Sequence, residues 1–207
     1  MAQHQEALEI LKEQKAVLDA GHFVYTSGKH GATYINKDAI YPDILAISKL
    51  CAILASHFAD SGAQVVAGPT VGGVVLTQWV AYHLIGAGHD EVVAVFAEEA
   101  EDKTRIFKRG YDKLVAGKNV LVVEDVLTTG ASVKKVVDAV VKLGGRPIGV
   151  AALCNRGNIE AAALGVRELF SLVNLPMQSW EAKDCPLCKK GVPVNVEVGK
   201  GSAWVKI

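Results

Sequence analysis

The middle of the chain alternates short apolar runs, rich in β-branched residues, with longer segments of helical periodicity. Strands are predicted at residues 65–67, 91–96, 119–123 and 147–153, and helices at residues 74–85 and 133–143. This alternation predicts an α/β fold with a mostly parallel central sheet flanked by helices. In such sheets, ligands bind beyond the carboxyl ends of the strands.

The two ends of the chain carry a different pattern. Residues 1–17 have the spacing of an amphipathic helix, residues 22–37 predict two short strands around a Ser-Gly-Lys turn, and residues 192–207 predict short strands around glycines. We therefore expect a single domain over residues 1–207. Its core would cover about residues 45–157, and a small hood would be built from about residues 1–40 and 174–207.

Composition and charge narrow the possible partners. Lys plus Arg equals Asp plus Glu at 22 each, so no net charge attracts nucleic acid or an anionic membrane, and any anion site must be local. The sequence has no run of about 18 apolar residues. Cys51 and Cys154 lie inside apolar segments, which does not suggest a disulfide framework. We expect a cytoplasmic protein without a membrane or nucleic-acid partner.

The stretch VLVVEDVLTTGAS, residues 120–132, holds the strongest candidate chemistry. Glu124 and Asp125, called the acid pair below, follow four apolar strand residues, and a turn of small residues then enters the next helix. Backbone N–H groups in such a turn, with Thr and Ser hydroxyls, can bind a phosphate. Carboxylates beside a phosphate make sense if the ligand also presents hydroxyls or a shared Mg²⁺, and a ribose 5-phosphate unit offers both. The alternative is an ordinary helix cap.

This stretch resembles the signature of the type I phosphoribosyltransferases, which bind 5-phospho-α-D-ribose 1-diphosphate (PRPP) with Mg²⁺. The P-loop and dinucleotide-binding glycine motifs are both absent. The resemblance implies that the acid pair holds the ribose hydroxyls, that the following loop cradles the 5′-phosphate, and that Mg²⁺ binds through PRPP rather than through firm protein ligands. The implied PRPP contacts beyond the acid pair are Val126, Leu127, Thr128, Thr129, Gly130, Ala131 and Ser132.

Two further segments concern the base and the diphosphate. Residues 22–37 resemble the N-terminal segment of orotate phosphoribosyltransferases, and this resemblance implies that Lys29 contacts the base. The family resemblance implies a base contact for Thr128 as well. GPTVGG, residues 68–73, occupies the place where the family binds pyrophosphate, although a tight turn without a ligand would look the same. The implied contacts there are Thr70, Val71 and Gly72.

Arg156 lies just beyond the carboxyl end of the strand predicted at residues 147–153. Its planar fork of donors suits a carboxylate, which orotate carries and uracil and the purines do not. The resembling family places an arginine here against orotate. The alternative is a surface ion pair.

A charged segment, residues 97–113, lies between two predicted core strands. Its basic residues could close over a diphosphate and shield the reaction from water, and the alternative is a solvated connector. Few apolar anchors suggest mobility without ligand. The segment lacks the Lys-Asp-His-Gly pattern of many orotate enzymes and is similar to a second pattern in the family, so an inactive paralogue stays open. The candidate catalytic residues, whose separate roles also stay open, are Lys103, Arg105, Lys108 and Arg109.

One motif stands apart from this chemistry. Cys185 and Cys188 form a C-x-x-C pair, which supplies half of a zinc site; a reversible disulfide and an inert turn are the alternatives. No histidine lies beside the pair at a zinc-ligand spacing, so a zinc site would need one pair from each of two subunits.

Together these features predict an orotate phosphoribosyltransferase, which makes orotidine 5′-monophosphate and pyrophosphate from orotate and PRPP, with Mg²⁺, in pyrimidine synthesis. The resemblance also implies a homodimer in which each charged loop serves the neighbouring site. The alternatives are a purine-salvage enzyme and a PRPP-sensing regulator on the same fold.

Overall fold

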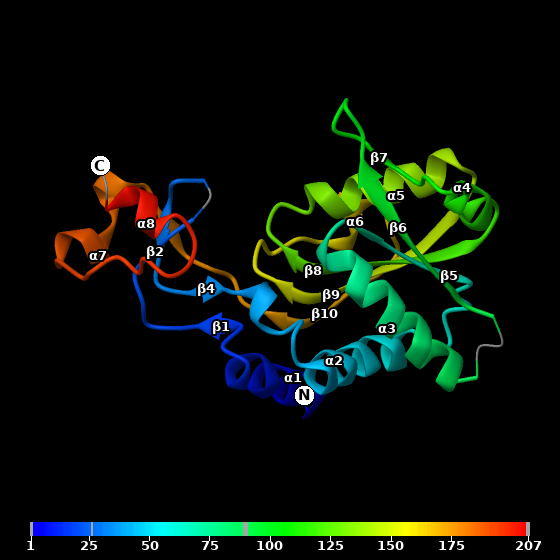
Figure 1. Cartoon of the computed structure of the whole chain (residues 1–207), viewed down its shortest axis with the longest axis horizontal. Coiled ribbons are helices and arrows are strands. Elements are labelled where there is room, and N and C mark those ends of the chain that lie inside the picture. The colour runs from blue at the N-terminus through cyan, green and yellow to red at the C-terminus, as the bar shows by residue number, and fades with distance from the viewer. Residues whose placement is uncertain (1, 26, 89–90, 206–207) are drawn as a thin grey trace.

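A six-stranded sheet forms the centre of the molecule in the computed structural model, which describes residues 2–25, 27–88 and 91–205 (Figure 1). The strand order is β10-β9-β8-β5-β6-β7, and every pair is parallel except β6 with β7. This confirms the predicted fold class. The strands are β5 (Val65–Pro69), β6 (Val93–Glu99), β7 (Arg105–Ile106), β8 (Asn119–Leu127), β9 (Arg146–Asn155) and β10 (Leu169–Asn174).

Helices cover both faces of this sheet because its strands are apolar on both sides. Val65 and Val66 are neighbours in β5, yet they are buried in different cores, since successive strand residues point to opposite faces. The core containing Val66 is covered by α1 (Ala2–Glu13), α2 (Ile44–His57) and α3 (Gly72–Gly86). The core containing Val65 is covered by α4 (Tyr111–Val115), α5 (Ala131–Lys142) and α6 (Ala161–Leu164).

A separate terminal lobe joins segments from both ends of the chain, which lie side by side in Figure 1. Its N-terminal strands include the predicted hairpin, and β11 of the C-terminal part pairs with β3 of that hairpin. The lobe consists of β1 (Val17–Leu18), β2 (Phe23–Val24), β3 (His30–Gly31), β4 (Tyr34–Ile35), β11 (Ser179–Trp180), the 3₁₀ helix η2 (Ala182–Asp184), α7 (Pro186–Lys189) and α8 (Gly201–Trp204). Another 3₁₀ helix, η1 (Lys37–Ala39), leads from the lobe to the sheet.

The described part of the tail, residues 192–205, contains no strand, so the strands predicted in residues 192–207 are wrong there. The side-chain oxygen of Asn195 accepts hydrogen bonds from the N–H groups of Glu197 (3.0 Å) and Val198 (3.1 Å). Such a turn withdraws these N–H groups from any strand ladder. The last element of the described residues is α8, and the part of this prediction at residues 206–207 lies outside them.

Two other expectations need correction. The first helix ends at Glu13 rather than near residue 17, and Lys15 has a left-handed φ of 54° before β1 begins. The charged segment has regular structure, because β7 pairs antiparallel with β6. It also has an apolar anchor, since Phe107 is only 7% exposed. No helix among the described residues is long and apolar enough to cross a membrane.

Candidate active site

The predicted site residues come together at the carboxyl ends of β5, β8 and β9. Strand β8 continues to Leu127, so the acid pair lies within its last residues rather than beyond it. Pairing of Glu124 with Ala152 and of Leu127 with Asn155 brings the end of β8 beside the end of β9, which Arg156 follows. The β5–α3 turn (residues 70–72) lies on the other side of β8, because β5 is its second neighbour.

The acid pair is buried, and the carboxylate of Asp125 is held by hydrogen bonds and an ion pair. Both residues are less than 10% exposed: Glu124 at 7% and Asp125 at 5%. The Tyr41 hydroxyl donates to Asp125 Oδ2 at 2.7 Å, and Lys37 Nζ lies 3.0 Å from the same oxygen. Asp125 Oδ1 accepts from the N–H of Val126 at 2.6 Å. These contacts fix one carboxylate at the end of β8.

The ionisation of this cluster is strongly perturbed. Burial, reinforced by the charge of Asp125, raises the pKa of Glu124 to about 8. Burial and the charge of Asp125 also raise the pKa of Tyr41, so its hydroxyl stays protonated and donates. Burial opposes the charged form of Lys37, but the charges of Asp125 and Asp38 and their hydrogen bonds with the lysine together outweigh it and raise its pKa. Below about pH 8 the site therefore holds one carboxylate, that of Asp125, which Lys37 balances, and a second negative charge forms on Glu124 only above that pH.

The β5–α3 turn packs against the acid pair so closely that glycine is required. A Cβ at Gly72 would lie 1.9 Å from Asp125 Oδ2 and 2.6 Å from the Tyr41 hydroxyl. A Cβ at Gly68 would lie 2.9 Å from the Cα of Gly73. The peptide between Thr70 and Val71 is cis, and the Val71 side chain is 80% exposed. Backbone atoms of the turn are thus held at the rim of the site.

The β8–α5 turn (residues 128–132) has the form of an anion site. Gly130 adopts a φ of 71° just before α5, which no side chain favours, and a Cβ there would lie 2.9 Å from Leu164. The first turn of α5 contains no acidic residue, so its free N–H groups face no opposing charge from that turn. Thr128 and Thr129 are exposed beside these N–H groups. The turn can therefore receive a phosphate.

Arg105 connects the two turns within one chain. Its Nη1 donates to Thr70 Oγ1 at 3.0 Å, and its Nη2 donates to Ser132 Oγ at 3.4 Å. The side chain is 10% exposed, and its buried Nε has no hydrogen-bond partner among the described residues. A guanidinium in this position can contact anions held by either turn.

The other basic residues of the charged segment lie elsewhere. Lys108 and Arg109 form ion pairs with Glu98, at 3.6 Å and 2.9 Å. Lys103 is exposed in the connection between β6 and β7. Of the four predicted basic residues, Arg105 is the one that the structure brings to both turns.

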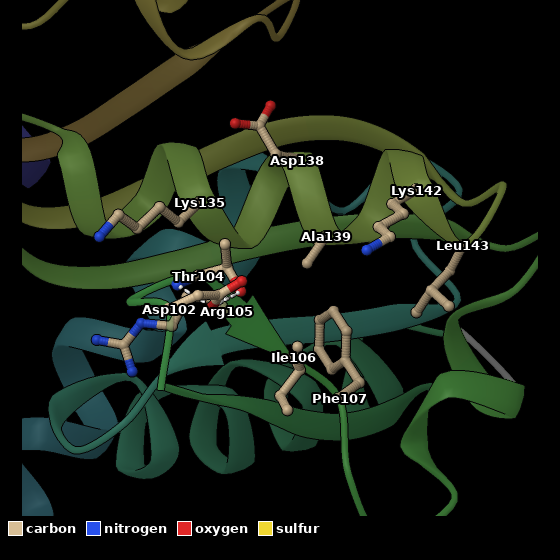
Figure 2. A pocket seen from close by; sticks show the side chains of 10 residues that line it. All are labelled: Asp102, Thr104, Arg105, Ile106, Phe107, Lys135, Asp138, Ala139, Lys142 and Leu143. Atoms are coloured by element: carbon tan, nitrogen blue, oxygen red, sulfur yellow. Dashed lines mark hydrogen bonds between the residues drawn. The ribbon is translucent and has the colours of Figure 1, made fainter. Parts of the chain in front are cut away.

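A cavity of about 310 Å³ lies between β7 and α5, and Figure 2 shows its lining. Apolar side chains such as Phe107 and Leu143 form one end of it, while the guanidinium of Arg105 is turned away from them. The acid pair and Arg156 do not line this cavity. We therefore place the candidate chemistry in a smaller cavity.

The smaller cavity, of about 190 Å³, opens beside the acid pair. Arg156 Nε donates to Thr128 Oγ1 at 2.9 Å, and the guanidinium carbon lies 5.1 Å from the centre of the Tyr25 ring. The Tyr25 hydroxyl in turn donates to the carbonyl of Thr33 at 2.6 Å. These contacts position the guanidinium at the cavity wall. The lining residues are Tyr25, Tyr34, Ile35, Lys37, Asp125, Val126, Thr128 and Arg156.

Lys29 does not line this cavity. Its Nζ lies 3.4 Å from Glu181 Oε1, and both side chains are about half exposed. The sequence analysis did not identify Lys37 and Tyr41, which both contact Asp125. Tyr41 is 84 residues away from Asp125, and no local pattern links them. The turn between β4 and α2 brings these two side chains to the sheet edge.

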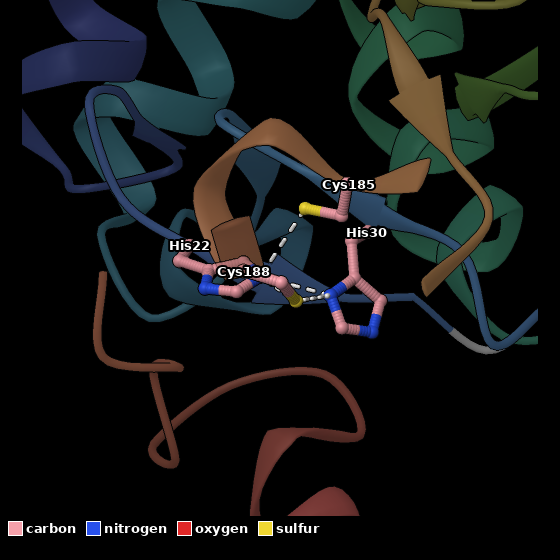
Figure 3. A group of neighbouring side chains, drawn as sticks. All are labelled: His22, His30, Cys185 and Cys188. Carbon is pink, nitrogen blue, oxygen red and sulfur yellow. Dashed lines mark hydrogen bonds between the residues drawn. The ribbon is translucent and has the colours of Figure 1, made fainter. Parts of the chain in front are cut away.

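Histidines do lie beside the C-x-x-C pair, so the expectation that one chain lacks two further zinc ligands is wrong. His22 and His30 meet Cys185 and Cys188 in the terminal lobe (Figure 3). The β3–β11 pairing joins these distant parts of the chain.

Comparisons with known proteins agree with this geometry. Residues 38–181 match the family model described as the phosphoribosyl transferase domain. The orotate phosphoribosyltransferase of Chlorobaculum parvum is 36% identical over 96% of this chain and 97% of that protein. The orotate phosphoribosyltransferase of Caldanaerobacter subterraneus subsp. tengcongensis is 40% identical over 92% of this chain and 94% of that protein.

Solved structures give the same result. Orotate phosphoribosyltransferase of Mycobacterium tuberculosis, in complex with Fe(III) dicitrate, superposes with a TM-score of 0.66 at 25% identity over 84% of this chain and 97% of that one. Adenine phosphoribosyltransferase of Saccharomyces cerevisiae shares the fold at 17% identity, with a TM-score of 0.61 over 80% of this chain and 99% of that one. The fold alone does not select the base, but identities of 36–40% over almost the whole chain do distinguish the families. This chain belongs to the orotate phosphoribosyltransferase family.

Proposed function

We propose that this chain transfers the ribose 5-phosphate of PRPP to orotate, giving orotidine 5′-monophosphate and pyrophosphate. The observation that carries the proposal is the position of Arg156, held by Thr128 and Tyr25 in the wall of a cavity that also contains Asp125. A fixed guanidinium pairs well with the carboxylate that distinguishes orotate from the purines and uracil.

PRPP would lie across the edge of the sheet. The β8–α5 turn would hold its 5′-phosphate through backbone N–H groups and hydroxyls. The β5–α3 turn would hold the diphosphate, and Arg105, bonded to Thr70 and Ser132, would contact phosphate oxygens between the two. The acid pair would accept hydrogen bonds from the ribose hydroxyls, which removes part of the cost of burying two carboxylates together.

The same residues suit the reaction. A ring N–H of orotate gives up its proton to the departing diphosphate or to water, and the nitrogen bonds to C1 of the ribose. The bond from C1 to the diphosphate oxygen breaks in the same step, and positive charge develops on the ribose. The acid pair lies where it can stabilise this charge, and the preorganised contacts of Asp125 with Tyr41 and Lys37 limit its reorganisation. Positioning of both substrates at one edge supplies the rest.

Mg²⁺ fits this site as a partner of PRPP rather than as an ion held by the protein alone. Asp125 already accepts from Tyr41, Lys37 and its neighbouring N–H, and the described residues offer no group of three acidic, histidine or cysteine ligands at this edge. Glu124 and Asp125 would complement an ion held mainly by diphosphate and ribose oxygens. Negative charge on the departing diphosphate would be neutralised by that ion.

We also propose a homodimer in which the exposed end of the β6–β7 connection, with Lys103, reaches the neighbouring site. Arg105 would act within its own subunit, because its contacts with Thr70 and Ser132 are made in one chain. The terminal lobe would serve as the hood over the base.

Pyrophosphate release, measured with PRPP, Mg²⁺ and a panel of bases, tests the proposal. Orotate should give turnover, while adenine, guanine, hypoxanthine and uracil should give almost none. Preference for a purine would refute the role of Arg156. Binding of PRPP without turnover of any base would indicate a sensor or an inactive paralogue.

A further inference from the structure

Two histidines and two cysteines form a compact cluster in the terminal lobe, and none of them lines the cavity of the proposed reaction. The ligand atoms of His22, His30, Cys185 and Cys188 all lie within 4.8 Å of one another, and three of the four residues are buried (Figure 3). We propose that this cluster binds one Zn²⁺ as a closed structural site. The inference does not depend on the proposed function.

The individual distances match a tetrahedral zinc site. With zinc–nitrogen and zinc–sulfur bonds of about 2.05 and 2.3 Å, the nitrogen–sulfur edges of a tetrahedron measure about 3.6 Å. His22 Nε2 lies 3.6 Å from the sulfur atoms of both Cys185 and Cys188, and His30 Nδ1 lies 3.3 Å from Cys188 Sγ. The two histidine nitrogens are 2.8 Å apart, and an ion between them would separate them by roughly another half ångström.

The hydrogen bonds orient His22 for metal binding. Its Nδ1 lies 2.7 Å from the carbonyl oxygen of Val192, which can only accept, so Nδ1 carries the proton. The lone pair of neutral His22 is therefore on Nε2, which points into the cluster. A backbone carbonyl that fixes the second nitrogen of a histidine is the usual outer contact of a zinc ligand.

His30 also presents a ring nitrogen, Nδ1, to the cluster. Its buried Nε2 has no hydrogen-bond partner among the described residues, and its Nδ1 faces the His22 ring. If Nδ1 binds Zn²⁺, Nε2 carries the proton, on the side of the ring away from the cluster. The Trp204 ring packs against His30 at 4.7 Å between centroids and 84° between planes, which excludes water from one side of it.

The backbone explains why these four residues converge. His22 immediately precedes β2, His30 begins β3 of the same hairpin, and β11 pairs with β3 just before the cysteines. Cys185 immediately precedes the short helix α7, so Cys188 lies one turn later on the same side. All four ligands come from one chain, and no position remains open for a substrate. Two cysteines with two histidines in this arrangement favour zinc over harder ions.

The site would join the two ends of the chain. The hairpin that it anchors contains Tyr25, which packs on Arg156, while the cysteines belong to the C-terminal segment. Short strands of two residues stabilise such a lobe weakly, so a metal crosslink contributes much of its order.

Elemental analysis of the full-length protein, purified without chelator, tests the proposal. We expect one zinc per chain, with almost none in Cys188→Ser and His30→Asn. Two matched controls, Cys51→Ala in α2 and His83→Asn in α3, change the same residue types outside the cluster and should keep one zinc per chain. A folded wild-type protein without zinc, or with iron instead, would overturn the proposal.

Cobalt substitution provides a second test that does not require a folded variant. Wild-type protein exchanged with Co²⁺ should show the intense near-ultraviolet absorption of cobalt–thiolate bonds and the visible bands of tetrahedral cobalt. Octahedral bands alone would refute the site. A Cys185–Cys188 disulfide found by mass mapping of the non-reduced, freshly purified protein would refute it too.

Discussion

Replacing Arg156 with alanine should impair the use of orotate far more than the binding of PRPP. Arg156 lies in the wall of the smaller cavity, and its Nε is occupied by Thr128 Oγ1 at 2.9 Å. One further donor, Nη1, makes only a weak 3.8 Å contact with the sulfur of Met177. The remaining N–H groups are therefore available for a carboxylate.

The expected loss follows from this geometry. A hydrogen bond to a charged group contributes about 1.5–3 kcal/mol, and removing one member of a partly buried charged pair costs about 2–5 kcal/mol. Because the cavity is open to solvent, we expect about 2–4 kcal/mol. This corresponds to a decrease of about 30- to 900-fold in kcat/KM for orotate.

Steady-state kinetics and PRPP titration measure the two effects separately. The dissociation constant of PRPP should change by less than about three-fold, since only the bond to Thr128 is lost on that side. Arg156→Lys, which keeps the charge but not the planar fork, should recover only part of the activity.

Arg146→Ala is the matched control for this experiment. Arg146 begins strand β9, at the end opposite Arg156, and donates to Asn119 Oδ1 at 2.8 Å. Its replacement should leave kcat/KM for orotate nearly unchanged. Unaltered kinetics in Arg156→Ala, or an equal loss of PRPP affinity, would refute the assignment of this arginine to the base.

Three more predictions concern the rest of the site. Gly72→Ala, whose Cβ would lie 1.9 Å from a carboxylate oxygen of the acid pair, should abolish turnover and lower the free energy of unfolding by about 1–3 kcal/mol. Gly86→Ala, at the other end of α3 with no atom within 4 Å of the added Cβ, should change neither turnover nor stability. Equal turnover and equal urea unfolding of the two variants would show that Gly72 is not packed against the acid pair. The folded-state pKa of Glu124 is about 8 against an ordinary 4.5, so folding penalises its ionised form fully above about pH 8 and not at all below about pH 4.5. Glu124→Gln should therefore stabilise the protein more at about pH 9 than at about pH 5, by at most about 5 kcal/mol, and an equal effect at both pH values in urea unfolding would show that the carboxyl group is not perturbed. Heterodimers of one subunit carrying Glu124→Gln and Asp125→Asn with one carrying Lys103→Ala should regain activity. Heterodimers of the same double variant with Arg105→Ala should stay inactive, because Arg105 acts in its own subunit. Recovery in both mixtures, or in neither, would contradict this division.

Local sequence patterns predicted the parts of this structure that local interactions determine. The apolar runs of β5 and β8 and the glycine turn before α5 are such cases, because burial on both faces and a φ of 71° at Gly130 leave few alternatives. The contacts of Asp125 with Lys37 and Tyr41 depend on how η1 meets the sheet, which no short segment encodes.

Contacts between the chain ends were equally hard to predict. His22 and Cys185 are 163 residues apart and meet only because β11 joins the hairpin. In the tail, the alternation of apolar residues suggested strands, but the side chain of Asn195 competes for the N–H groups that a ladder would need.

A crystal structure of the protein with orotidine 5′-monophosphate would be the decisive test of where the phosphate, the ribose and the base bind. We expect the 5′-phosphate on the N–H groups of the β8–α5 turn, the ribose hydroxyls on the acid pair, and the base carboxylate paired with Arg156. Phosphate bound instead in the cavity between β7 and α5, or a carboxylate directed away from Arg156, would contradict it.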